Sequence, residues 1–170
     1  DLAVARVDRV TGAISTVVVD PRSGVFLTRS EYVRGYAVID MEVMASFGGT
    51  AADEVAVLAR NPRQGAVQVY VSDTGSGEVL AVVGFDPRFT PLGLAVVPHF
   101  GGSPADELAV LVFDAVRGSA RVLIKDGESG QALKTLAFAD GYIPIDLDVV
   151  RSIGGSPADE LAVLVRRPDE

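Results

Sequence analysis

Two pairs of carboxylates have a spacing that could support chemistry. Asp40 and Glu42 stand two residues apart, and so do Asp146 and Asp148. Residues two apart in a β-strand share a face, so each pair would present its carboxylates side by side. Paired carboxylates can carry out acid–base catalysis, as in glycoside hydrolysis, or bind a cation. The alternative, which we favour, is that they are solvated acids at the starts of strands in an acidic protein.

Other catalytic groups are scarce in this chain. His99 is the single histidine, and there is no cysteine. A multi-histidine metal site, a thiolate metal site and a Ser-His-Asp triad with a spare base are therefore excluded. We interpret His99 as a loop residue and expect no cofactor.

The composition is that of a soluble globular protein. Of the 170 residues, 48% are hydrophobic and 22% are charged, which is enough apolar material for a substantial core. The formal net charge of −8 argues against nucleic acid and anionic membranes as partners, because both attract basic surfaces. No apolar run approaches the roughly 18 residues of a membrane-spanning helix, so we expect no membrane insertion.

The sequence repeats itself every 53 residues. GGSPADELAVLV occupies residues 101–112 and again 154–165, and the looser copy GGTAADEVAVLA occupies 48–59. A period of this length indicates an array of similar structural units. Gly93 and Ala95 stand in the middle unit at the positions of the paired acids, so the architecture does not require those acids. We expect a single repeat domain over residues 1–170, with units at about 1–46 (partial), 47–99, 100–152 and 153–170 (partial).

Each unit has the pattern of four short strands. ELAVLV is almost continuously apolar, which is typical of a strand covered on both faces, whereas AVQVYVSD alternates. An Asp-x-x-Ser-Gly loop follows the second strand at residues 20–24, 73–77 and 126–130. Asp accepts hydrogen bonds from nearby backbone amides, and Gly takes the left-handed conformation that closes a hairpin. The predicted turn residues are Asp20, Gly24, Asp73, Gly77, Asp126 and Gly130.

Four antiparallel strands per unit match one blade of a β-propeller better than any competing array. We therefore predict an all-β protein, a β-propeller built from four-stranded blades, with no helix longer than a turn or two. A β-sandwich of about a dozen strands is the alternative. It would explain the strands but not the 53-residue register.

The stretch HFGGSPADELAVL resembles the calcium-loop segment of the FG-GAP and VCBS-type repeats of integrin-like propellers. In those repeats Asp-Phe-Asn-Gly-Asp-Gly-x-x-Asp precedes a Leu-x-Val strand, and the corresponding segment recurs in all three periods here. The resemblance implies that PIDLDVV is the innermost strand A of a blade and DELAVL is strand B. It implies that strands C and D flank the Asp-x-x-Ser-Gly hairpin. It also implies an extracellular or cell-surface location.

The calcium ligands of that family are largely missing. Its first, third, fifth and ninth loop positions supply oxygen ligands; here they are Ser46, Gly48, Thr50 and Glu54, then His99, Gly101, Ser103 and Glu107, then Ser152, Gly154, Ser156 and Glu160. Calcium needs six to eight oxygens, usually with several carboxylates among them. We therefore predict loops that are held by backbone turns and bind no metal. The candidates for a residual, weak calcium site are Asp53, Glu54, Asp106, Glu107, Asp159 and Glu160.

Two functions from different classes stay open. The first is a non-catalytic propeller module of a cell-surface or secreted protein, which displays loops for contact with a protein or a glycan or serves as a scaffold. The second is a propeller enzyme, such as a lyase or glycosidase, that uses the paired acids near the axis. The similarity of the units favours the first, because an active site needs unlike residues that converge on one point.

Closure of a ring is expected to need a second chain. In family order the strands run B-C-D, A-B-C-D, A-B-C-D, A-B, so the two ends of the chain complement each other. Because propellers usually have four or more blades, we expect a homodimer that forms a six-bladed, two-fold symmetric ring. One spare strand B, at residues 1–7 or 160–165, would be displaced or would pair at an edge.

Overall fold

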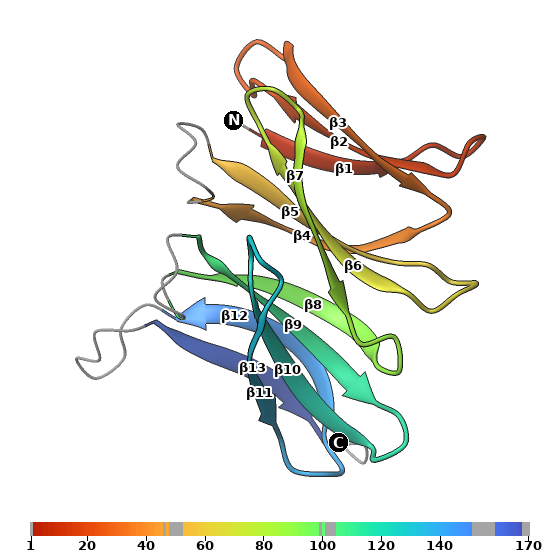
Figure 1. Ribbon diagram of the computed structural model, residues 1–170, viewed down its shortest axis with the longest axis vertical. Coiled ribbons are helices and arrows are strands. Elements are labelled where there is room, and N and C mark those ends of the chain that lie inside the picture. Colours follow the sequence, from red (N-terminus) through yellow and green to blue (C-terminus); the bar gives the residue numbers. More distant parts are fainter. Residues whose placement is uncertain are drawn as a thin grey trace.

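The computed structural model describes residues 2–45, 47, 53–98, 100, 105–150 and 159–167. These residues form strands joined by turns and include no helix, and therefore no helix long and apolar enough to cross a membrane (Figure 1). The prediction of an all-β fold is confirmed. The strands are β1 (Leu2–Val7), β2 (Ala13–Val19), β3 (Phe26–Arg34), β4 (Ala37–Met44), β5 (Glu54–Arg60), β6 (Val67–Asp73), β7 (Val79–Phe85), β8 (Thr90–Val97), β9 (Glu107–Asp114), β10 (Ser119–Asp126), β11 (Ala132–Ala137), β12 (Ile143–Val150) and β13 (Glu160–Arg166).

The strands form four antiparallel sheets in chain order. Their orders are β1-β2-β3, β4-β5-β6-β7, β8-β9-β10-β11 and β12-β13. This is the strand order expected from the repeat, with a B-C-D sheet, two complete A-B-C-D sheets and an A-B sheet. The sheets stack one after another, and β8 lies between β4 and β12 (Figure 1). The described sheets do not close into a ring.

The hydrophobic core lies in the layers between neighbouring sheets. On β9, Leu108 and Val110 pack against the second sheet, whereas Ala109 and Leu111 pack on the side of β12. All four side chains are buried. Because β9 is covered on both faces, its sequence has apolar residues at consecutive positions instead of alternating with polar ones.

Each innermost strand has an irregularity at the same repeat position. The pairing register shifts around Ile39 in β4, Leu92 in β8 and Ile145 in β12. These three side chains are exposed. A bulge of this kind bends the strand and re-aims the side chains beside it. The next residue is Asp40 in β4 and Asp146 in β12, so the bulge sets where these acids lie.

The Asp-x-x-Ser-Gly segments form the turns between strands C and D. Asp20 Oδ1 accepts a hydrogen bond of 2.8 Å from the Arg22 amide, and Asp126 Oδ1 accepts one of 2.6 Å from the Ser129 amide. Asp73 Oδ1 accepts the corresponding bond from the Ser76 amide. The closing residues have positive φ values of 69°, 79° and 69°, which favour glycine; they are Gly24, Gly77 and Gly130.

Candidate functional site

The two acid pairs of the sequence lie on β4 and β12, which flank β8. Partial desolvation raises the pKa of Glu42, and the negative charges of Asp40, Asp148 and Asp146 raise it further. Acids from strands that are distant in sequence therefore act on one another. Gly93 of β8 lies between them, and a Cβ atom there would stand 3.6 Å from Asp40 Oδ2.

Three of these four acids bind backbone amides. Asp40 Oδ1 accepts a hydrogen bond of 2.8 Å from its neighbour Met41, and its Oδ2 accepts one of 2.9 Å from the Leu94 amide on β8. The latter bond joins two sheets. Asp146 Oδ1 and Asp148 Oδ1 accept bonds of 2.9 and 2.7 Å from the amides of the residues that follow them. The Asp40 bond to Leu94 links two innermost strands, whereas the bonds of Asp146 and Asp148 stay within β12.

The predicted calcium-loop acids differ in their surroundings. Glu54, Asp106 and Glu107 are buried, whereas Asp53 is exposed. Glu107 Oε2 accepts a hydrogen bond of 2.7 Å from the Phe100 amide, so the ninth loop position holds the loop backbone.

The last of these acids, Asp159 and Glu160, are half-buried at the start of β13. Among the residues that the structure describes, no group of three or more His, Asp or Glu side chains could hold a metal ion. Much of each loop lies outside the described residues: 46, 48–52, 99, 101–104 and 151–158, which include His99.

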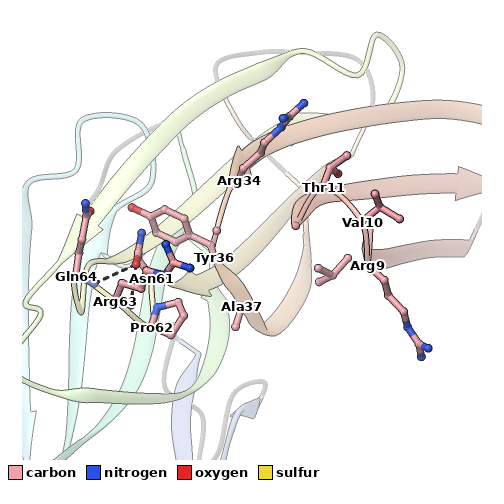
Figure 2. Close-up of a pocket in the computed structure, with 13 residues that line it drawn as sticks. Arg9, Val10, Thr11, Arg34, Tyr36, Ala37, Asn61, Pro62, Arg63 and Gln64 are labelled. Atoms are coloured by element: carbon pink, nitrogen blue, oxygen red, sulfur yellow. Dashed lines mark hydrogen bonds between the residues drawn. The ribbon is translucent and has the colours of Figure 1, made fainter.

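A pocket that the sequence analysis did not predict opens between the first two sheets (Figure 2). It has a volume of about 680 Å³. Its walls come from the hairpin after β1, the connection from β3 to β4 and the hairpin after β5. We call it the arginine pocket; its lining residues are Val7, Arg9, Val10, Thr11, Gly12, Arg34, Gly35, Tyr36, Ala37, Asn61, Pro62, Arg63 and Gln64.

The lining of the arginine pocket carries positive charge only. It includes Arg9, Arg34 and Arg63 and no acid. All three arginines are exposed, and none forms an ion pair with a described residue. Figure 2 shows Arg9 and Arg34 extending away from each other, while Arg63 lies on the far side near Tyr36. The positive charges are thus spread around an open depression.

The nearest acid in the sequence does not line the pocket. Asp8 Oδ1 accepts hydrogen bonds of 2.8 and 2.7 Å from the amides of Val10 and Thr11. These two backbone bonds lower the pKa of the Asp8 carboxyl. Its carboxylate therefore holds the hairpin after β1. Asp8 is not among the lining residues, which include no acid.

Asn61, which lines the pocket, forms the turn of the hairpin after β5. Its Oδ1 accepts hydrogen bonds of 2.9 and 3.0 Å from the amides of Arg63 and Gln64. The equivalent residues 53 positions before and after it are Asp8 and Asp114, which accept the same turn bonds. The second unit therefore keeps the turn but lacks the negative charge.

A cluster of tyrosines packs against one lining residue of the pocket, Tyr36. Tyr36 meets Tyr70 edge-on, with the ring centroids 6.2 Å apart, and Tyr70 packs on Tyr32 at 5.2 Å. Burial raises the pKa of Tyr70 to about 12, with Tyr36 contributing. The Tyr70 phenol therefore stays neutral at physiological pH, and the charged residues that line the pocket are its arginines.

Sequence reasoning missed this pocket because its arginines occupy unrelated repeat positions. The residues equivalent to Arg34 and Arg63 in the next unit are Pro87 and Val116. The one signal was Asn61, a neutral residue at a position that is Asp in the neighbouring units.

Comparison with known proteins supports the fold alone. No family model matches the chain, and no curated protein matches it. Among solved structures, the chain is similar to one described as "Structure of Dos1 propeller", with a TM-score of 0.52 and 15% sequence identity. The similarity covers 81% of this chain and 35% of that chain, so this chain spans about a third of its length. The antiparallel sheets described above have the arrangement of a β-propeller.

Proposed function

We propose that the chain is a non-catalytic β-propeller repeat module that contacts a protein or a glycan. The observation that carries this proposal is the arginine pocket between two sheets. Its three arginines form no ion pair with a described residue, and its Tyr36 ring packs against Tyr70. Binding surfaces built on hairpin loops over a rigid scaffold are common in repeat proteins. The engagement of Asp40, Asp146 and Asp148 with backbone amides supports a structural role for the acids instead of catalysis.

A propeller enzyme, lyase or glycosidase in type, is the second candidate. The raised pKa of Glu42 favours it, because a general acid needs a carboxyl that keeps its proton near the working pH. Asp148 would then be the partner carboxylate. This candidate predicts turnover of a glycan that depends on both side chains.

The proposal includes membership of a repeat family similar to FG-GAP and VCBS-type propellers, with calcium loops that have become metal-free. The hydrogen bond from the Phe100 amide to Glu107 supports it. In that family the residue at this position would bind calcium, whereas here its carboxylate binds the loop backbone. The proposal also includes four-stranded blades that form a closed ring, and an extracellular or cell-surface location, as in that family.

An array experiment tests the proposed function. The labelled chain is applied to printed glycans and to printed peptides, with calcium and with excess chelator. We expect specific binding that chelator leaves unchanged and that an E42Q/D148N variant retains. Release of sugar fragments by the wild type, lost in E42Q/D148N, would establish the enzyme instead. Absence of any ligand on both arrays would contradict the binding module.

A further inference from the structure

We propose that the arginine pocket binds a short acidic peptide segment of a partner protein. This inference rests on the proposed function, since it names the ligand class of the same module. The pocket offers Arg9, Arg34 and Arg63 without a lining acid. Arginine binds carboxylates through paired N–H donors, so a segment rich in Glu or Asp matches this lining.

The separation of the arginines favours an extended ligand over a single small anion. Arg9 and Arg34 point away from each other, and Arg63 lies across the pocket beside Tyr36 (Figure 2). The three guanidinium groups do not converge on one point in this arrangement, so a single phosphate or carboxylate does not match them. A peptide with several carboxylates can place one at each arginine.

The apolar part of the lining suits a polypeptide. Val7, Val10 and Pro62 also line the pocket, and Val10 is 95% exposed. Tyr36 adds an aromatic ring that is itself fixed against Tyr70. Side-chain methylenes of a bound peptide can cover these groups while the carboxylates reach the arginines.

The arginine pocket differs from the next inter-sheet surface, where the arginines are paired with acids. There Asp114 Oδ2 lies 3.2 Å from Arg121, and Asp86 forms hydrogen bonds with Arg88 down to 2.6 Å. Asn61 stands in the first surface at the position of Asp114. The chain thus has two inter-sheet surfaces that can be compared. In one the arginines are paired with acids, and in the other they are available to an anion.

The overall charge limits the ligand to a short segment. The chain carries a formal net charge of −8, so the rest of the chain without the three arginines is more negative still. A long polyanion, such as nucleic acid or a sulfated glycan chain, would extend onto this negatively charged remainder and be repelled. A segment no longer than the pocket avoids this repulsion.

Fluorescence anisotropy with a labelled, short peptide that alternates glutamate and alanine tests the proposal, with the matching glutamine peptide as control. We expect the glutamate peptide to bind at low salt and to weaken as salt rises, because exposed charges are screened. R63E should weaken binding about tenfold or more, the size expected when a close charge pair is reversed. N61D should weaken it severalfold while keeping the turn, since Asp accepts the same amide bonds at the equivalent positions.

R22E is the matched control because Arg22 is exposed in the hairpin at the other end of β2. It changes the net charge as R63E does and should leave the affinity unchanged. Equal loss in R22E and R63E, or equal binding of the glutamate and glutamine peptides, would overturn the proposal. So would tighter binding of a sulfated oligosaccharide of similar charge. If the glutamate peptide does not bind but the arrays yield another ligand, this inference fails and the proposed function stands.

Discussion

The side-chain hydroxyl oxygens of Tyr32 and Ser72 lie 2.7 Å apart, and their hydrogen bond joins the first sheet to the second. Tyr32 also shares a bond of 2.9 Å with Thr16. In the next unit the equivalent residues are Phe85 and Lys125, and the Lys125 ammonium lies 5.2 Å from the Phe85 ring centroid. The repeat therefore joins its sheets by a hydrogen bond between hydroxyls at one interface. At the next, the Lys125 ammonium makes the cation–π contact and also donates a hydrogen bond of 2.7 Å to the Gly84 carbonyl oxygen.

Y32F should destabilise the protein by about 1–3 kcal/mol, because it leaves the buried Thr16 and Ser72 hydroxyls without this partner. The ring itself should fit, since Phe85 occupies the equivalent position. Urea denaturation measures the change. In a T16V/S72A background the same substitution should cost much less; an equal cost would mean that these hydrogen bonds contribute little.

The strand order was predictable from the sequence because each blade needs particular residue types at fixed positions, and these recur every 53 residues. Continuous apolar residues mark strand B, and Asp with Gly marks the hairpin. Contacts between sheets were not predictable, because they depend on which positions face each other across the stack. The bond from Leu94 to Asp40 and the gathering of Arg9, Arg34 and Arg63 belong to this second class.

D40A should be more destabilising than D146A. Asp40 accepts the amide of Leu94, whose side chain is buried, so its removal leaves that donor without this bond between sheets at a cost of about 1–3 kcal/mol. Asp146 is exposed and accepts only the amide of its own neighbour Leu147 among the described contacts. Thermal unfolding of both variants checks the order. Equal losses would show that the bond to Leu94 adds nothing.

G77A should be more destabilising than G130A, although both glycines have positive φ. A Cβ atom at Gly130 would meet nothing closer than Val83 at 3.6 Å, so its cost is the left-handed backbone alone, about 1–2 kcal/mol. A Cβ atom at Gly77 would stand 2.5 Å from the carbonyl oxygen of Arg29 on the first sheet. Denaturant midpoints compare the two. A smaller loss for G77A would refute this packing of hairpin on strand.

Self-association should be detectable in solution. Val4 of β1 is 44% exposed, whereas the equivalent Val57 is fully buried between sheets; Leu164 of β13 is 59% exposed, whereas Leu111 is fully buried. Burying such side chains is favourable, so the outer sheet faces provide apolar surface for a second copy. Light scattering should give about twice the 17.7 kDa chain mass. V4D should shift the protein toward monomer, and a monomeric wild type would contradict the two-chain ring.

E42Q should stabilise the protein at neutral pH, and the gain should shrink as the pH falls. The pKa of Glu42 is raised in the folded state by partial desolvation and by Asp40, Asp148 and Asp146, so its ionised form opposes folding. As the pH falls from the raised folded-state pKa toward the ordinary value of 4.5, Glu42 binds its proton more readily in the folded chain. The wild type then approaches the neutral variant in stability.

Urea unfolding of both proteins across this pH window measures the difference. E128Q is the control, because Glu128 is exposed in the hairpin after β10 and its loss changes the net charge equally. If E128Q reproduces the pH-dependent gain, the effect comes from total charge. If E42Q gives no gain at neutral pH, the acids of β4 and β12 do not act on one another as their positions beside β8 indicate.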